Sequence, residues 1–237
     1  MTRAARLPVS GAWALVPVKP FGLAKSRLGA LLSAAERNVL AQAMLKDVME
    51  ALWQAHGLNG VLVVTSDPEA QSIARSFGAK VLNDPLDTGT NTAVELGLRY
   101  LAKAGASRAL VVPGDIPFIV ADEIEAALFA MDWNPVVLAP ARRDGGTNLL
   151  GLRGPDVITP AFGPDSFARH LAAAKLLGLE PAILQLSGAS NDIDVPGDLM
   201  TGKLAGGPAR RTRALLARIT DLKMRASTQN TLELSRL

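Results

Sequence analysis

The chain has 237 residues, of which 49% are hydrophobic and 4% aromatic, so it can fill a sizeable core with mainly aliphatic side chains. It contains no cysteine, which excludes disulfide bonds and thiolate metal or redox sites. The net charge is only +3 and one tyrosine is present, whereas nucleic-acid-binding proteins usually carry a broad basic stripe interleaved with aromatic residues. We therefore do not expect nucleic acid as the partner.

The sequence shows no sign of a membrane segment. No run of about eighteen apolar residues occurs, so we expect no membrane-spanning helix. The basic N-terminal residues are not followed by the apolar stretch that a signal peptide needs. We therefore expect a cytoplasmic protein.

Short apolar runs alternate with amphipathic stretches along the chain. The apolar runs predict strands at 12–18, 60–65, 80–82, 109–112, 136–138, 148–152 and 182–186. Helical spacing predicts helices at 33–55, 68–77, 92–104, 122–131 and 164–177. Strands that alternate with crossover helices are typical of βαβ units. The sequence therefore predicts a Rossmann-like three-layer α/β/α fold with a mainly parallel central sheet, whose strands are apolar throughout because both faces are buried.

Two further features concern helix ends and domain boundaries. Ser33 is followed by Glu36 three residues later, which is the pattern of a capping box at the start of a helix. From about residue 203 the chain becomes polar and basic after a glycine-rich linker. We therefore predict a catalytic domain at 1–202 and a basic C-terminal tail at 203–237, either helical or disordered.

The loop after the first strand is cationic. It contains Lys19, Lys25 and Arg27 together with a glycine, and it has no carboxylate. Several cations and a close backbone approach suit the charge and size of a nucleoside triphosphate. The loop matches neither the P-loop nor the G-x-G-x-x-G pattern. A solvated basic loop without a ligand is the alternative.

Acidic residues follow two later strands. Asp115 lies in a tight turn directly after the strand at 109–112, and Asp192 and Asp194 would lie on the same face of an extended segment. Carboxylates so placed can hold Mg²⁺, which completes its shell with phosphate oxygens and water. The alternatives are that Asp115 caps a turn and that Asp194 caps a helix that starts near Pro196.

A third group of polar residues surrounds the predicted helix at 164–177. Gly163 leaves free N–H groups at a helix start and Ser166 adds a hydroxyl, which together suit an anion. Asp165 would oppose an anion there, so we expect it to point away or to act as a cap. We expect His170 to be a polar residue on the helix face rather than a base. Asn91 suits contact with a nucleoside or, alternatively, a helix N-cap.

With these loops identified, the chain resembles the CofC/FbiD family of phospholactate-type guanylyltransferases, which are nucleotidyltransferases. The matching segments are VPVKPFGLAKSRL (16–28), DTGTNTAVELG (87–97), VVPGDIP (111–117), DGGTNLL (144–150), FGPDSFARH (162–170) and DIDVPGDL (192–199). The resemblance implies transfer of GMP from GTP onto a three-carbon phospho-acid, with release of pyrophosphate, in the biosynthesis of the deazaflavin coenzyme F-420. The acceptors it implies are 2-phospho-L-lactate, phosphoenolpyruvate or 3-phospho-D-glycerate, and the sequence does not choose among them.

The resemblance also implies roles for individual residues. The expected Mg²⁺ ligands are Asp115, Asp192 and Asp194. The expected contacts of the phospho-acid are Thr147, Gly163 and Ser166. The expected nucleotide contacts are Lys19, Lys25, Arg27 and Asn91. Catalysis is expected to depend on Lys25, Arg27 and Asp115, because bringing two polyanions together requires positioning and charge neutralisation rather than a base.

Two other functions stay open at this stage. One is a cytidylyl- or uridylyltransferase that acts on a sugar or alditol phosphate. The other is a non-catalytic binding module that uses the basic tail on RNA or on a partner protein. The oligomeric state also stays open between a monomer and a homodimer.

Overall fold

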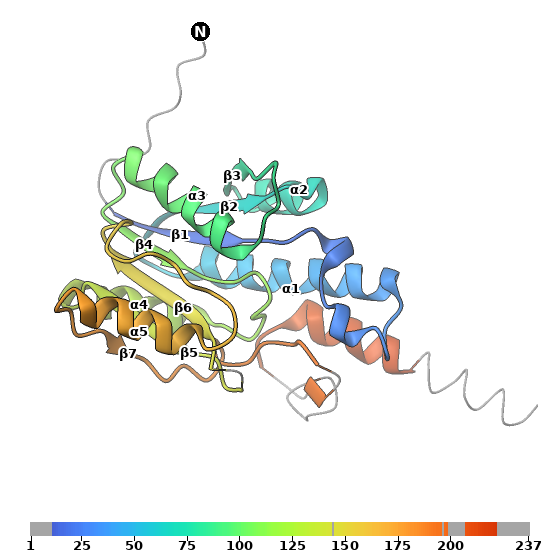
Figure 1. The fold of residues 1–237 in the computed structure, drawn as a ribbon. Coiled ribbons are helices and arrows are strands. Elements are labelled where there is room, and N and C mark those ends of the chain that lie inside the picture. The colour runs from blue at the N-terminus through green and yellow to red at the C-terminus, as the bar shows by residue number, and fades with distance from the viewer. Residues whose placement is uncertain (1–10, 144, 196, 199–206, 222–237) are drawn as a thin grey trace, which may run out of the picture.

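The computed structural model describes residues 11–143, 145–195, 197–198 and 207–221, and Figure 1 shows their arrangement. In these residues the strands form one seven-stranded sheet in the order β3-β2-β1-β4-β6-β5-β7. The strands are β1 (Ala12–Pro17), β2 (Leu58–Thr65), β3 (Lys80–Asn83), β4 (Arg108–Val111), β5 (Val136–Pro140), β6 (Thr147–Arg153) and β7 (Ala182–Ile183). The predicted strands are thus all present, although β7 is shorter than expected.

The sheet is parallel except at one strand. The pairs β1–β2, β1–β4, β2–β3 and β5–β7 are parallel, whereas β6 runs antiparallel to both β4 and β5. Only residues 141–146 connect β5 to β6. A parallel pair needs a crossover of a dozen or more residues, so this short connection leaves only a hairpin. The prediction of a mainly parallel sheet is confirmed.

The helices occur where helical spacing predicts them. They are α1 (Ala34–Gln54), α2 (Pro68–Ser76), α3 (Thr90–Lys103), α4 (Ala121–Trp133) and α5 (Ser166–Leu176), with short 3₁₀ helices η1 (Phe21–Leu23) and η2 (Ser26–Leu28). The predicted capping box is confirmed at the start of α1. The Ser33 hydroxyl accepts from the Glu36 N–H at 3.2 Å, and the Glu36 carboxylate accepts from the Ser33 N–H at 2.7 Å.

Two helix starts differ from the prediction for a local reason. α3 begins two residues early because Gly89, at φ 113°, turns the chain at its N-cap, so Asn91 is not the cap. α5 begins at Ser166 rather than at 164, because Gly163 (φ 120°) and Asp165 (φ 55°) have backbones outside the right-handed helical region. Positive φ angles of non-glycine residues leave no clear trace in the hydrophobic pattern.

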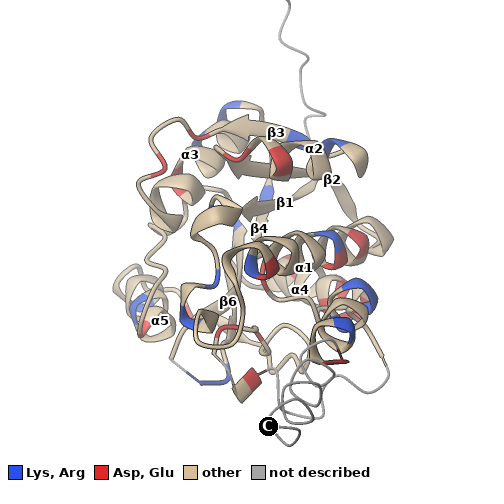
Figure 2. Ribbon diagram, turned by 90° about the vertical axis from the view of Figure 1, so that its right-hand side faces the viewer, with Lys and Arg blue, Asp and Glu red and all other residues tan. Residues whose placement is uncertain are grey.

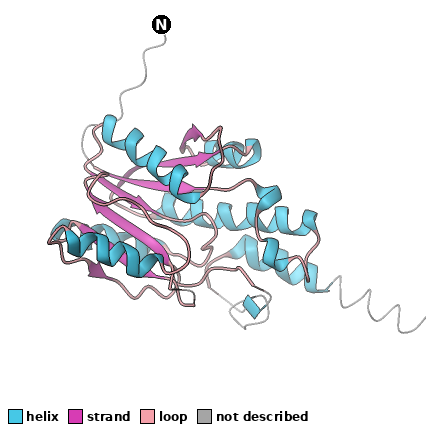
Figure 3. Ribbon diagram, viewed as in Figure 1, coloured by secondary structure: helices cyan, strands magenta, loops and turns pink. Residues whose placement is uncertain are grey.

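Helices cover both faces of the sheet, as Figure 3 shows. Alternate residues of β1 enter two separate apolar clusters: Ala14 and Val16 pack with α1, α2 and α4, whereas Trp13 and Leu15 pack with α3 and α5. This alternation follows from the two-residue period of a strand. The three-layer α/β/α fold is therefore confirmed.

The C-terminal region corrects the prediction of a separate tail. The boundary predicted at 202/203 lies outside the described residues, but residues 210–221 form a helix that lies beside α1 in Figure 1. Ala209, Leu216 and Ile219 are buried in the same apolar cluster as α1. Of the two predicted states of the tail, helical or disordered, residues 210–221 have the helical one. These residues are part of the apolar core and not outside it.

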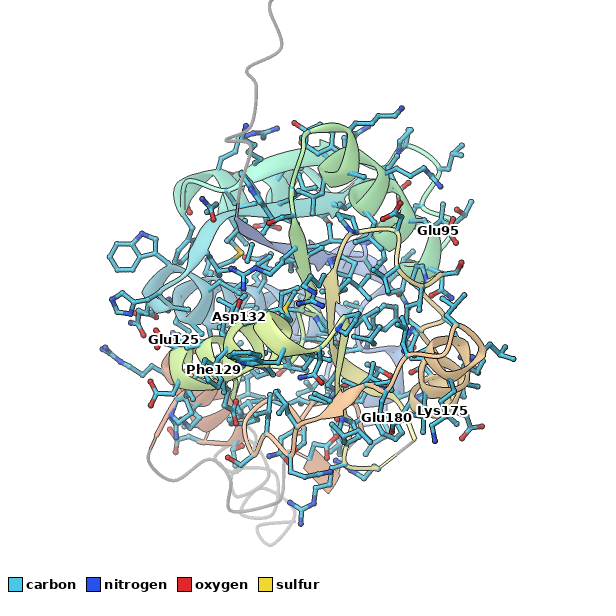
Figure 4. The ribbon with its side chains drawn as sticks, turned by 90° about the vertical axis from the view of Figure 1, so that its left-hand side faces the viewer. Glu95, Glu125, Phe129, Asp132, Lys175 and Glu180 are labelled. Atoms are coloured by element: carbon cyan, nitrogen blue, oxygen red, sulfur yellow. The ribbon has the colours of Figure 1, made fainter. Side chains whose placement is uncertain are left out.

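The two ends of the sheet differ in character. Figure 2 looks onto the end where β1 ends, and the loops there carry both acidic and basic residues. Figure 4 shows the opposite end, where Asp132 of α4 forms an ion pair with Arg108 of β4. Among the described residues, no helix has both the length and the apolar composition needed to cross a bilayer. The candidate site lies at the first end.

Candidate active site

A cavity of about 350 Å³ opens at the carboxyl ends of β1 and β4. Its lining residues come from the cationic loop, from α1, from the start of α3 and from two acidic loops. Its charged lining residues are Lys19, Lys25, Arg27, Asp115 and Asp194. In doubly wound sheets, ligands bind at this edge because the loops that leave adjacent strands converge there. These residues are far apart in the sequence, and the fold brings them together.

Lys25 lies at the centre of this group. Its Nζ donates to Asp115 Oδ2 and to Asp194 Oδ1, each at 2.8 Å, and only 3% of its side chain is exposed. Burial disfavours the charge of Lys25, but the two carboxylates outweigh this effect, so the pKa of Lys25 is raised. The backbone of Lys25 is left-handed, at φ 56°. A buried ammonium is thus fixed between two carboxylates.

The carboxylates respond to each other and to Lys25. Burial alone would raise the pKa of Asp115. The adjacent Lys25 ammonium lowers this pKa by more than burial raises it, so the net shift is downward. The pKa of Asp192 is raised, first by burial and then by the negative charge of Asp115, with a smaller contribution from Asp194. Asp115, Asp192 and Asp194 are therefore close enough to interact electrostatically.

The chemistry of this group fits a divalent cation. Carboxylate oxygens are the protein ligands that Mg²⁺ prefers, and the ammonium of Lys25 already occupies a position where a cation neutralises Asp115 and Asp194. As they stand, no three Asp, Glu or His side chains in the described part of the chain are close enough together to hold one ion. If this group holds a divalent cation, Asp115 and Asp194 would be among its ligands in place of part of their contact with Lys25, and the ion would supply charge neutralisation for a phosphate.

The other two cations lie nearer the solvent. Arg27 Nη1 lies 3.6 Å from Asp194 Oδ2, and 69% of its side chain is exposed. Lys19 is also exposed where it lines the cavity. Exposed ion pairs stabilise a fold only slightly, so these side chains remain able to reorient toward an anionic ligand.

The fold holds the acidic and cationic loops in place by hydrogen bonds to backbone N–H groups. The buried Asp198 carboxylate accepts from the N–H groups of Asp194 at 2.8 Å and Val195 at 3.0 Å, and it forms an ion pair with Arg143. The Asp194 carboxylate contacts Lys25, whereas the alternative that it caps a helix starting near residue 196 lies outside the described residues. Asp67, the N-cap of α2, accepts from the Phe21 N–H at 2.8 Å and so fixes the cationic loop.

A second polar cluster joins β6 to α5. Ser166 Oγ accepts from the Thr147 N–H at 2.8 Å, and Thr147 Oγ1 lies 2.9 Å from His170 Nδ1. His170 Nε2 accepts from the Ala161 N–H at 2.8 Å, so Nε2 carries no proton and Nδ1–H donates to Thr147. His170 is fully buried, which corrects its prediction as a polar residue on the helix face.

The charge state of His170 follows from its surroundings. Burial lowers the pKa of His170 to about 4, and the nearby Arg169 contributes in the same direction. The imidazole is therefore neutral near pH 7 and already uses both ring nitrogens. In this geometry the imidazole contacts Thr147 and the Ala161 backbone, and the expectation that it is not a base stays a prediction.

The remaining predicted residues lie around the same cluster. Gly163 is exposed just before α5, and Asp165 makes no side-chain cap hydrogen bond there. Asn91 pairs with the Phe162 backbone, because its Nδ2 donates to the carbonyl at 3.1 Å and its Oδ1 accepts from the N–H at 2.6 Å. Asn91 thus ties α3 to the loop before α5, and its contact with a nucleoside stays a prediction. None of these residues, nor Thr147 or Ser166, lines the 350 Å³ cavity.

Sequence reasoning missed several residues that support the site. Asp67, Asp198 and the pairing of His170 with Thr147 all depend on partners distant in sequence or on backbone groups. Glu123 belongs with them, since its carboxylate accepts from the N–H groups of Gly188 at 2.6 Å and Ala189 at 3.0 Å. For Asp67 the sequence offered an acidic residue soon after a strand, but the Asp-Pro pair at 67–68 is also typical of an ordinary helix start.

Comparison with known proteins gives a consistent family. Residues 12–236 match the family model "Guanylyl transferase CofC like". The chain is 43% identical over 186 residues to a phosphoenolpyruvate guanylyltransferase of Sphaerobacter thermophilus, covering 78% of this chain and 89% of the relative. It is 39% identical over 206 residues to a 3-phospho-D-glycerate guanylyltransferase of Phenylobacterium zucineum, covering 85% and 92%. It is 36% identical over 186 residues to a 2-phospho-L-lactate guanylyltransferase of Methanothermobacter thermautotrophicus, covering 78% and 81%.

Solved structures agree on the fold. A protein described as a nucleotide-diphospho-sugar transferase, from Desulfovibrio desulfuricans G20, superimposes with a TM-score of 0.73 at 20% identity, covering 89% of this chain and 96% of that chain. A cytidylyltransferase from Leptospira borgpetersenii superimposes with a TM-score of 0.55 at 12% identity, covering 91% and 94%. At these identities the likeness establishes the shared fold alone.

Proposed function

The chain belongs to the CofC-like guanylyl transferase family, and we propose that it transfers GMP from GTP onto a three-carbon phospho-acid with release of pyrophosphate. Relatives named for phosphoenolpyruvate, 3-phospho-D-glycerate and 2-phospho-L-lactate support this acceptor class, a small phosphorylated carboxylic acid. Within the same proposal, the reaction is a step in the biosynthesis of coenzyme F-420.

One observation carries the proposal more than any other. Lys25 donates to Asp115 and Asp194 at 2.8 Å each, inside a cavity that Lys19 and Arg27 also line. A site that combines fixed carboxylates with several cations suits a metal-bound polyphosphate, because the carboxylates hold the metal and the cations neutralise the phosphates. We propose Asp115, Asp192 and Asp194 as ligands of Mg²⁺, which would polarise the phosphate oxygens.

The cations assist the breaking of the bond between the α- and β-phosphates of GTP. A phosphate oxygen of the acid attacks the α-phosphorus of GTP, a new P–O bond forms, and the bond to the β-phosphate breaks to release pyrophosphate. The attacking oxygen is already an anion at neutral pH, so no side chain needs to remove a proton. Lys25, Lys19 and Arg27 lower the repulsion between the two anions and stabilise the charge that gathers on pyrophosphate.

The cluster at α5 supports binding of the acceptor acid. The Thr147 hydroxyl accepts from His170, so its own hydrogen is available to donate. The positive end of the α5 dipole lies beside the exposed Gly163 backbone and favours an anion there, although the N–H groups of Ser166 and Phe167 already donate to the carbonyls of Gly163 and Gly145. In the proposal, Thr147, Gly163 and Ser166 bind the acid, which then approaches the cavity from the α5 side.

The substitution Asp115→Asn tests the proposal. We expect turnover of GTP and the phospho-acid, measured as released pyrophosphate, to fall by at least about 100-fold, the usual effect of removing a group that stabilises transition-state charge. The circular dichroism spectrum should stay that of the wild type, because asparagine has nearly the same side-chain shape as aspartate. The matched control is Asp122→Asn, an exposed aspartate in the first turn of α4. Turnover by Asp115→Asn at the wild-type rate in saturating Mg²⁺ would refute the role of this carboxylate.

A further inference from the structure

Asp84 is a buried carboxylate that the mechanism above does not use. It follows β3 directly, and it is only 4% exposed. Its backbone N–H donates to the Thr65 carbonyl at 3.3 Å, but no described residue forms a hydrogen bond or ion pair with its carboxylate. Its oxygens are not among the fully buried unpaired polar atoms of the described residues, so they remain open to the adjoining space, where they can accept hydrogen bonds from a ligand.

The Asp84 carboxylate lines a small hollow beside the main cavity. The lining residues of this hollow are Pro17, Val18, Lys19, Asp84, Asp87, Gly89, Thr90 and Ala93. Pro17, Val18, Lys19 and Thr90 also line the 350 Å³ cavity, so the two spaces adjoin. The hollow measures about 10 Å³, which is room for one water molecule. A ring edge that takes the place of this water would lie beside Asp84, with the rest of the ring in the adjoining cavity.

We propose that Asp84 recognises the base of the nucleotide and makes the site selective for guanine. The inference rests on the proposed function, in which the triphosphate occupies the cavity beside Lys25 and Asp115. Lys19 borders both spaces, so a nucleotide whose phosphates lie near Lys19 can place its base toward Asp84. The specificity-determining residue is then on the β3 side of the cavity, away from the acceptor acid.

Guanine has the edge that matches a carboxylate. Its N1–H and its 2-amino group are adjacent donors, and the two oxygens of Asp84 can accept from both at once. Adenine and cytosine present an acceptor beside an amino donor, and uracil presents one N–H between two carbonyl groups. Each of these would leave an oxygen of Asp84 unpaired or facing an acceptor, which a buried carboxylate tolerates poorly.

Neighbouring groups do not offer Asp84 another role. The Asn83 side chain already pairs with Gln71, at 3.0 Å from its Oδ1. Lys19 forms no ion pair with Asp84 within 4.0 Å in the described residues. The same residues contain no group of three Asp, Glu or His that could bind a metal. The free oxygens of Asp84 therefore suit an uncharged donor edge.

The substitution Asp84→Asn tests the inference with GTP, ITP and XTP as nucleotides. An Asn side chain still accepts from the N1–H, but its amide nitrogen donates, so it suits the 2-carbonyl of xanthine in place of the 2-amino group of guanine. For Asp84→Asn we expect kcat/KM with GTP to fall about 100-fold, the effect of mispairing a charged hydrogen bond, and kcat/KM with XTP to rise above that of the wild type. The wild type should use ITP, which lacks the 2-amino group, less well than GTP.

The outcomes separate this inference from the proposed function. If the wild type releases no pyrophosphate from GTP with any acid, the proposed function fails. If the wild type is active but Asp84→Asn lowers the rates with GTP and XTP equally, or leaves both unchanged, Asp84 does not read the base. A gain with XTP in Asp87→Asn instead would assign the base to the exposed neighbour and overturn the inference. Asp122→Asn serves as the control with unchanged nucleotide preference.

Discussion

Lys25 shows how a single side chain can stabilise a site whose carboxylates would otherwise repel one another. Asp115 and Asp194 converge on its ammonium at 2.8 Å each, and Asp192 has a raised pKa because burial and Asp115 disfavour its charge. Two carboxylates that line one cavity, with a third near enough to feel their charge, need a cation. In the free protein Lys25 supplies part of that charge, and in the proposed reaction Mg²⁺ would take it over while Lys25 contacts the phosphates.

The sequence predicted which charged residues belong to the site, but it did not predict which residues they contact. Composition and position after a strand identified Asp115 and the cationic loop as candidates for one site. The contacts between Lys25 and the two aspartates span 90 and 169 residues of sequence, so no local pattern could reveal them. The burial of His170 was missed for the same reason, because its partners Thr147 and Ala161 belong to other segments.

The neutral, buried His170 predicts a dependence of stability on pH. Its pKa is about 4 in the folded state, against 6.5 for an unperturbed histidine, so the unfolded chain takes up a proton first as the pH falls. The contribution of His170 to stability is complete above about pH 6.5 and is lost as the pH falls toward 4, by up to about 3 kcal/mol. Urea unfolding at pH 7, 5.5 and 4.5 measures this loss.

Two variants isolate the contribution of His170. His170→Gln cannot take up this proton, so its unfolding free energy should fall less between pH 7 and 4.5 than that of the wild type. His56→Gln removes the exposed histidine, whose side chain is 92% accessible and pairs with Glu125, so it should change this dependence by less than His170→Gln does. Parallel curves for His170→Gln and the wild type would contradict the assignment of a buried, neutral imidazole.

At the scale of elements, the spacing of hydrophobic residues predicted which segments are helices and strands. It did not predict how these segments are connected or where each helix is capped. The direction of β6 followed from the length of its connection to β5, and the starts of α3 and α5 depended on residues with positive φ. Residues 210–221 were expected to lie outside the core because their composition is basic. Leu216 and Ile219 nevertheless bury an apolar stripe beside α1, and the charged residues occupy the remaining faces.

Asp47 of α1 should be essential for docking the helix at 210–221. Its buried carboxylate accepts from the Arg211 N–H at 3.2 Å and the Thr212 N–H at 2.8 Å, which are among the first N–H groups of that helix. Asp47→Ala would leave both donors without a partner, so we expect the free energy of unfolding to fall by about 2–3 kcal/mol. Chemical denaturation measures the change.

Glu50→Ala is the matched control for Asp47→Ala. Glu50, like Asp47, forms an ion pair with the Arg211 side chain, but in the described residues it bonds no backbone group of the helix, and it is partly exposed. Its loss should cost less than about 1 kcal/mol. Equal losses for the two variants would mean that the ion pair with Arg211, rather than the backbone capping by Asp47, holds the helix in place. Because the helix at 210–221 packs against α1, truncating the chain after residue 203 would not leave the free energy of unfolding unchanged.

At the scale of the molecule, the sheet places two kinds of site side by side. The parallel strands β3, β2, β1 and β4 carry the cationic loop, Asp84 and Asp115, whereas β6 and α5 carry Thr147 and Ser166. The proposed function assigns the nucleotide to the first half and the phospho-acid to the second. Their meeting point is the group of carboxylates around Lys25, at the end of the sheet that faces the viewer in Figure 2.

The identity of the product tests this account most directly. Phosphorus NMR can follow the protein with Mg²⁺, one of GTP, CTP or UTP, and each of the three phospho-acids in turn. The account predicts that GTP with one of these acids gives the paired signals of a new diphosphate, which links GMP to the acid, together with an equal amount of pyrophosphate. It is contradicted if GTP remains intact with every acid, if it yields only GDP and phosphate, or if CTP or UTP is the nucleotide consumed.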